Sequence, residues 1–215
     1  MHKVLPSSAA RHEGITKPRL LVSIWRKPQA TLAFILAKCP DEYVSALFLL
    51  GGVARAVERA IVQHQKDKLD AGSILLLAVV MGGISGWIIS SLYTWVLAIV
   101  GRWLGGAAGS ERFKTVVAWA QVPVAAGLLL LWPALVFLKD VSFLKLRLAY
   151  PLLTSSVLPV LFVAKLVLGS WSVAILLQGT TLVQGFSMGR ALINILLPGV
   201  LVAAFILLIA GLLPG

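Results

Sequence analysis

Residues 71–101 read AGSILLLAVVMGGISGWIISSLYTWVLAIVG and contain no charged side chain. As a single helix this run would be about 46 Å long, whereas the hydrocarbon core of a bilayer is about 30 Å thick. The run therefore predicts a membrane-spanning helix that is tilted or broken. Gly82, Gly83 and Gly86 are the positions at which it would bend or pack closely, and Gly82 and Gly86 form a GxxxG pair suited to helix packing.

The composition of the whole chain agrees with a membrane protein. Of 215 residues, 59% are hydrophobic and 13% are charged, which is about half the charge density of an average soluble domain. We predict an all-α polytopic membrane protein with five transmembrane helices. The expected spans are residues 42–62, 72–101, 115–138, 156–178 and 190–212. A division of the fourth apolar run at Lys165 would give six spans instead.

Two of these spans are expected to be irregular. Pro123 and Pro133 should kink the third span, because proline lacks the N–H that continues a helix. The fourth span should end near residue 178, since QGTTLVQGFSMG at 178–189 is polar and rich in glycine. This stretch predicts a poorly helical connection.

The N-terminal segment, residues 1–39, precedes the membrane domain at 40–215. Within it, residues 20–38 place Leu21, Trp25, Leu32 and Ile35 at helical spacing, with Arg26 and Lys27 beside them. This pattern indicates an amphipathic helix at the membrane interface, with Trp25 at head-group depth. A surface helix folded onto the membrane domain is the alternative.

The net charge of +11 does not indicate nucleic-acid binding, because the basic residues lie between the apolar runs. There they act as topology signals and as contacts to anionic lipid. With five spans, Lys and Arg are more numerous on the side of the N-terminus. The positive-inside rule then predicts a cytoplasmic N-terminus and a C-terminus outside the cytoplasm.

Four blocks of sequence resemble the bacterial members of the Yip family, whose eukaryotic members interact with Ypt/Rab GTPases. The blocks are SIWRKPQAT at 23–31, GGVARAVERA at 51–60, VVAWAQVPV at 116–124 and LGSWSVAILLQGTTLVQGFSMGRALINILL at 168–197. The resemblance implies five spans with a cytoplasmic N-terminal segment, in the bacterial inner membrane. It also implies a membrane scaffold. The positions carried over from the AWAQVP and QGFS blocks are Trp119, Pro123, Gln184, Gly185, Phe186 and Ser187.

Ser85 lies in a GISG sequence at 83–86 that matches the G-x-S-G pattern of rhomboid intramembrane proteases. A serine nucleophile needs a base within hydrogen-bond reach. No histidine lies in any predicted span, and His64 lies just past the first. We therefore interpret Ser85 as a small residue in a glycine-rich packing face and predict that the protein is not an enzyme.

Lys165 is the most costly residue to place in a bilayer, because it falls within a predicted span. A buried lysine seeks an acidic partner, and Glu58 is the leading candidate. The alternative is that Lys165 extends to an interface. Glu58 shares one helical face with Arg55 and Arg59, so these residues form either a structural polar clasp or part of a ligand or proton pathway.

These observations favour a non-enzymatic membrane scaffold or accessory protein that acts through membrane-protein partners, a second copy of itself or local lipid organisation. We expect no cofactor, and the single cysteine, Cys39, excludes a cysteine metal cluster. The alternative is a small transporter or lipid-translocating protein with a polar path along Lys165, Glu58 and Gln121.

Overall fold

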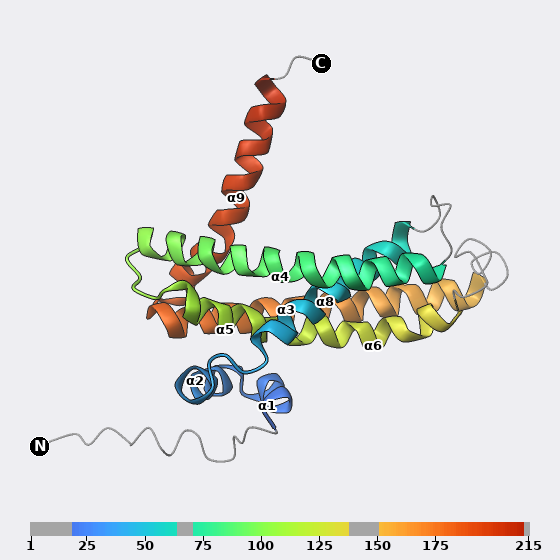
Figure 1. The fold of residues 1–215 in the computed structure, drawn as a ribbon, viewed down its shortest axis with the longest axis horizontal. Helices are drawn as coiled ribbons and strands as arrows, with labels where there is room; N and C mark the ends of the chain where they lie inside the picture. The colour runs from blue at the N-terminus through green and yellow to red at the C-terminus, as the bar shows by residue number, and fades with distance from the viewer. Residues whose placement is uncertain (1–18, 64–70, 138–150, 213–215) are drawn as a thin grey trace, which may run out of the picture. The chain divides into compact units, whose positions relative to one another are not determined.

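The computed structural model describes residues 19–63, 71–137 and 151–212. Within these ranges every regular element is a helix (Figure 1), so the all-α prediction is confirmed. The chain divides into two compact units. Unit 1 comprises Met1–Glu42, Ser91–Trp119 and Ile175–Gly215, and unit 2 comprises Tyr43–Ser90 and Ala120–Ala174.

The N-terminal segment of unit 1 forms two short helices in place of the expected single helix over 20–38. Helix α1 spans Leu20–Arg26 and α2 spans Pro28–Lys38. The break lies at Lys27, whose backbone leaves the helical region because a residue that precedes proline disfavours it. Pro28 then occupies the first position of α2, where its missing N–H costs nothing.

The break also changes which side chains face inward. Leu20 and Ile24 of α1 are buried, as are Leu32 and Ile35 of α2, but Leu21 is 48% exposed. Leu21 therefore does not share the buried face of Leu32 and Ile35. A continuous helix would have kept Leu21 on the face of Leu32.

Helix α3, Val44–Gln63, and helix α4, Ala71–Trp103, follow. The structure shows α4 as one unbroken helix, so Gly82, Gly83 and Gly86 do not interrupt it. The unit boundary falls within α4, between Ser90 and Ser91.

The third apolar run forms two helices, with a break just before Pro123. Helix α5 spans Ser110–Ala120 and α6 spans Val122–Phe137, with Gln121 in a turn between them. Pro123 lies in the first turn of α6, so the backbone leaves the helical path just before it. In unit 2, the Ser172 hydroxyl donates to the Ala120 carbonyl oxygen at this break, at 2.6 Å. The expected kink at Pro123 is thus present, whereas α6 continues through Pro133.

Helix α8, Pro151–Gln184, is longer than the expected fourth span and corrects the predicted connection at 178–189. Only Gly185–Ser187 separate it from α9, Met188–Leu212. The polar residues of this stretch remain helical because the Thr180 and Thr181 hydroxyls donate to carbonyl oxygens of the preceding turn, at 2.8 and 2.7 Å. The helix ends at Gly185, whose φ of 68° suits glycine.

Four helical segments in the described residues are long and apolar enough to cross a membrane. They are Leu75–Trp103, Ser110–Leu130, Pro159–Gln184 and Met188–Gly211. These segments support an integral membrane protein. Helix α3 is not among them, since it carries Arg55, Glu58 and Arg59 within 20 residues.

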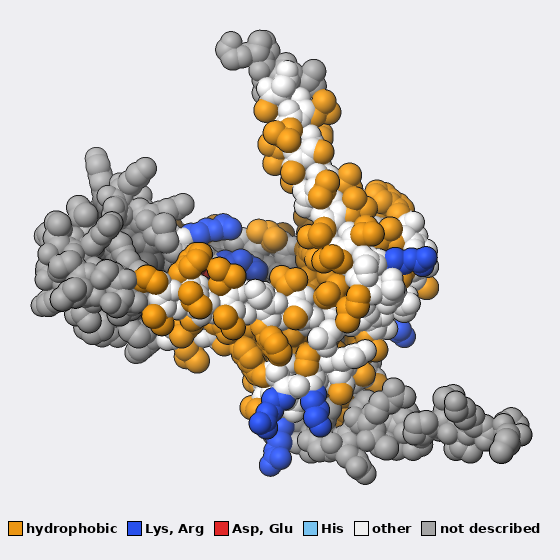
Figure 2. All heavy atoms as spheres, turned by 180° about the vertical axis from the view of Figure 1, so that it is seen from behind, with side chains coloured by type: hydrophobic (Ala, Val, Ile, Leu, Met, Phe, Trp, Pro, Cys, Tyr) orange, Lys and Arg blue, Asp and Glu red, His pale blue; other side chains and the backbone are white. Residues whose placement is uncertain are grey.

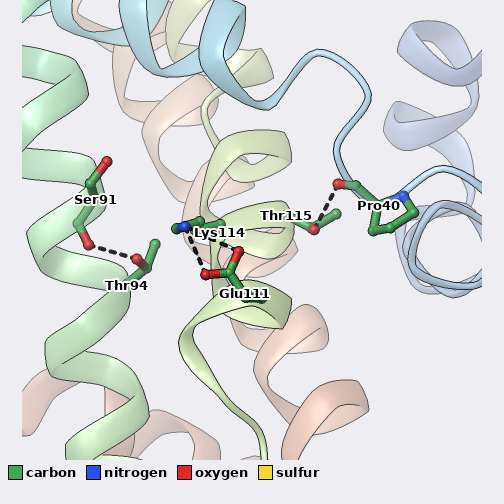
Figure 3. A network of polar contacts seen from close by, with 6 residues as sticks. All are labelled: Pro40, Ser91, Thr94, Glu111, Lys114 and Thr115. Atoms are coloured by element: carbon green, nitrogen blue, oxygen red, sulfur yellow. Dashed lines mark hydrogen bonds and ion pairs between the residues drawn. The ribbon is translucent and has the colours of Figure 1, made fainter.

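Polar contacts join the elements of unit 1 near the start of α5 (Figure 3). The Thr115 hydroxyl donates to the Pro40 carbonyl oxygen at 2.8 Å, which ties α5 to the residue just after the N-terminal segment. Lys114 pairs with Glu111 on the surface of α5, at 2.8 Å. An exposed pair within one helix adds little stability, so of these two contacts only that of Thr115 links α5 to another part of the chain.

Candidate functional site

In unit 2, α3 and α4 cross through glycines. A Cβ atom added at Gly52 would overlap the Gly82 carbonyl oxygen and lie 2.6 Å from the Gly86 Cα atom. A Cβ atom at Gly86 would likewise overlap the Gly52 Cα atom. The two backbones therefore approach more closely than any larger residue allows, as in membrane helix pairs with small residues. The predicted packing role of Gly82 and Gly86 is present here, and their counterpart Gly52 was not predicted from the sequence.

Directly beside this crossing, Gln121 holds two helices of unit 2. Its Nε2 atom donates to the Ser90 Oγ atom of α4 at 2.9 Å, and its Oε1 atom accepts from the Arg55 Nη2 atom of α3 at 3.2 Å. Gly51 leaves the space that the amide fills, because a Cβ atom there would overlap Oε1. Gln121 lies at the break between α5 and α6. Pro123 therefore helps to position Gln121, because it interrupts the helix at that point.

One turn further along α3, Glu58 forms an ion pair with Lys165 of α8. This is the partner that the sequence favoured for Lys165. The side chains of Lys165 and Glu58 are 27% and 49% exposed, so the pair lies at the edge of the packed region. Arg59, the next residue of α3, is exposed. We name Arg55, Glu58, Arg59, Gln121 and Lys165 together the Arg55 cluster.

Unit 1 contains a second polar group at the start of α9. The Gln184 Oε1 atom accepts from the Ala108 backbone N–H at 3.0 Å. The Gln184 Nε2 atom and both amide atoms of Asn194 are buried and have no hydrogen-bond partner among the described residues. Gly101 lies against both side chains, since a Cβ atom there would overlap Gln184 Nε2 and lie 3.4 Å from Asn194 Nδ2. We name Gln184 and Asn194 the Gln184–Asn194 pair.

The remaining positions from the family-like blocks are distributed between packing and turn roles. Trp119 is fully buried and Phe186 nearly so, and Phe186 lies against Gly106. Gly185 forms the turn after α8, and Ser187 is exposed. These four residues shape helix packing and the α8–α9 turn, and they do not belong to the Arg55 cluster.

Ser85 has a local role in α4. Its hydroxyl donates to the Gly82 carbonyl oxygen at 3.3 Å, which is a common bond for a helical serine. His64, the candidate base nearest in sequence, lies outside the described residues. No group of three or more His, Cys, Asp or Glu side chains within the described part of the chain could hold a metal ion.

The expected interfacial residues lie on the surface of unit 1. Arg26 and Lys27 are exposed and Trp25 is half-buried. Figure 2 shows Lys and Arg side chains gathered in the region of α1 and α2. Leu21 and Val22, at 48% and 66% exposure, add apolar surface to the same short helix.

Ser90 and Asn194 are two inward-facing polar residues of apolar helices that were not predicted from the sequence. Both stand within long apolar runs, so a polar residue in a predicted span was the signal that could have found them. No family model, curated protein or solved structure matches the chain. The resemblance to the Yip family therefore stays a prediction.

Proposed function

We propose that this chain is a non-enzymatic integral membrane protein of the Yip family that acts as a scaffold for other membrane proteins. The observation that carries the proposal is the exposure of α9. Every residue from 199 to 211 is exposed, and Figure 2 shows hydrophobic side chains along this helix. A spanning helix of a multi-spanning protein commonly packs one face against its neighbours, whereas this part of α9 is exposed on every face.

The composition of α9 suits a partner helix. Lipid tails are as apolar as leucine, so helices associate in a membrane through close packing at small residues rather than through the hydrophobic effect. Gly199 and Ala203 lie one turn apart on the exposed part of α9. They offer a face on which another helix can approach closely.

The Arg55 cluster supports a structural role over a transport path. Gln121 is 5% exposed and fills the space at Gly51, and it is hydrogen-bonded at both ends of its amide. A residue held in this way fixes α3 to α4. The transporter alternative needs Gln121, Glu58 and Lys165 to line a water-filled path.

Photo-crosslinking within the membrane tests the scaffold proposal. A photoreactive residue is placed singly at positions 200 to 206 of α9, in the full chain in native membranes. We expect protein adducts to recur every three to four positions, because a partner helix covers one face. The same residue at exposed Ile88 of α4 is the control. Lipid adducts alone at every α9 position would contradict the proposal.

The proposed topology has five spans, with α3 as the first, the N-terminus in the cytoplasm and the C-terminus outside, in a bacterial inner membrane. The number of crossings depends on helix α3. The four segments of sufficient length and hydropathy would by themselves leave both termini on the same side of the membrane, and α3 as a fifth span would place them on opposite sides. A reporter that is active only in the cytoplasm, fused after Gly215, should be silent. An active reporter would show an even number of crossings.

The proposed place of α1 and α2 is the cytoplasmic surface of the membrane. Exposed Leu21 and Val22 would enter the head-group region, and Arg26 and Lys27 would each contribute about 1 kcal/mol near anionic lipid. Fluorescence of a probe attached at position 22 should shift to the blue on addition of anionic vesicles to delipidated protein. An unchanged spectrum would contradict this placement.

A further inference from the structure

The Arg55 cluster carries more positive charge than its own carboxylate can balance. Arg55, Glu58 and Arg59 share one face of α3, and Lys165 of α8 pairs with Glu58. Among the described residues of the cluster, three cations thus surround one acid. Arg55 and Arg59 are one helical turn apart, a spacing at which like charges repel. An anion bound between them would relieve this repulsion.

The protein also positions one of these cations. The Gln121 amide oxygen accepts from Arg55 Nη2 at 3.2 Å, and the amide is itself anchored on Ser90 at 2.9 Å. A guanidinium group has five N–H donors in a rigid fork, and one amide oxygen cannot satisfy them. The fork of Arg55 is therefore held in place with capacity for a multidentate acceptor such as a phosphate.

The residues that α3 contributes to the cluster lie near the C-terminal end of that helix. Glu58 is five residues from Gln63, the end of α3, which is about 8 Å. Long basic side chains at this depth can reach the phosphates of the nearer leaflet.

The surroundings identify the source of the anion. On α8, Phe162 and Leu166 near Lys165 are 65% and 55% exposed. Figure 2 shows Lys and Arg side chains set among hydrophobic ones on this part of unit 2. A soluble anion would have to leave water for an apolar surface, whereas a phospholipid places its phosphate beside the cations and its acyl chains on Phe162 and Leu166.

We propose that the Arg55 cluster binds the head group of an anionic phospholipid, with the phosphate between Arg55, Arg59 and Lys165. Arg55 and Arg59 donate hydrogen bonds to the phosphate oxygens. The ammonium group of Lys165 attracts the phosphate while it also pairs with Glu58. The lipid site does not depend on the scaffold function, because it rests on unit 2 and the scaffold rests on α9.

Native mass spectrometry of the full chain in an uncharged detergent tests this site. Phosphatidylglycerol is titrated into the delipidated protein, and the affinity of the first bound lipid is measured. Arg59→Gln should weaken that affinity by about tenfold, the effect of one lost charge-assisted hydrogen bond. Arg112→Gln, which removes an exposed arginine of α5, is the matched control and should change it less than about twofold.

A second variant separates binding from a purely structural role. Glu58→Gln removes the carboxylate that competes for the cations, so the affinity for phosphatidylglycerol should rise. A structural clasp predicts no such increase. Phosphatidylcholine in place of phosphatidylglycerol should bind at least about fivefold more weakly, because its choline carries a positive charge that the cluster repels.

Three results would overturn the proposal. Equal losses in Arg59→Gln and Arg112→Gln would show that general surface charge attracts the lipid. Equal affinities for the two lipids would remove the case for an anionic head group. Displacement of the lipid by inorganic phosphate at the same concentration would assign the cluster to a soluble anion instead.

Discussion

Gln121 of unit 2 and Gln184 of unit 1 both place a carboxamide inside the protein against glycines, and they differ in how well that carboxamide is satisfied. Gln121 uses both ends of its amide, on Ser90 and Arg55. Gln184 uses its oxygen on Ala108, while its Nε2 atom and the neighbouring Asn194 amide have no partner among the described residues.

This difference separates two kinds of helix contact. Hydrogen bonds to an amide are strong in an apolar environment, because breaking them would leave a polar group unpaired there. The α3–α4 contact therefore combines glycine packing with a complete polar link. The contact of α9 with the rest of unit 1 includes a pair whose buried polar atoms cost stability. We expect the α3–α4 contact to be sensitive to changes in packing and polarity, and the Gln184–Asn194 pair to tolerate loss of polarity.

The largest effect should come from closing the glycine crossing of unit 2. Gly52→Ala and Gly86→Ala each place a methyl group against the backbone of the partner helix, which cannot rotate away. We expect a loss of about 3 kcal/mol or more in the free energy of unfolding, measured by denaturant titration in mixed micelles. Gly83→Ala is the control, because its nearest contacts would be side-chain atoms at 3.6 Å. Equal effects at Gly83 and Gly86 would contradict the close crossing.

The next effect should distinguish the two glutamines directly. Gln121→Leu removes the partner of both Ser90 and Arg55 and should cost about 2–3 kcal/mol in the free energy of unfolding. Gln184→Leu breaks one bond to a backbone N–H and should cost about 1 kcal/mol. Both variants are measured in the same titration. A larger loss at Gln184 than at Gln121 would reverse the comparison.

A smaller effect, with the opposite sign, is expected at Asn194. Asn194→Leu replaces an unpartnered buried amide with an apolar group of similar size, which can be neutral or stabilising. The free energy of unfolding should stay constant or rise by about 1 kcal/mol. Asn194→Ala, which leaves a cavity, serves as the control and should be destabilising. A clear loss in Asn194→Leu would show that the amide has a partner in the membrane-embedded protein.

The smallest effect is expected at Ser85, beside the glycine crossing. Its hydroxyl donates to the Gly82 carbonyl oxygen of its own helix, so Ser85→Ala should change the free energy of unfolding by less than about 0.5 kcal/mol. A fluorophosphonate probe should label the wild-type chain and the variant to the same extent. Labelling that disappears in Ser85→Ala would point to an activated serine.

Parts of these two regions follow from the sequence alone. The uncharged run at 71–101 predicts a long apolar helix, and α4 is one. The lone lysine of the fourth run favours an acidic partner, with Glu58 as the leading candidate, and Glu58 is its partner. The break at Gln121 follows from Pro123, because the missing N–H of proline is a local effect.

Other parts depend on tertiary contacts. The stretch 178–184 has the composition of a loop, yet it is helical because threonine hydroxyls bond within the helix and Gly179 packs against Val116. Composition could not show this, since the same side chains favour turns when no neighbour packs against them.

The sequence by itself determined the class of protein, the helical runs and the charge that must be compensated, because hydropathy, proline geometry and the cost of charge in lipid are properties of local composition. Only the tertiary structure decided that Gly52 meets Gly82 and Gly86, and that Gln121 bridges Ser90 and Arg55. Gln121 lies 31 and 66 positions along the chain from these two partners. Periodicity assigns each residue to a helix face, whereas the choice of the opposing face depends on how the helices pack.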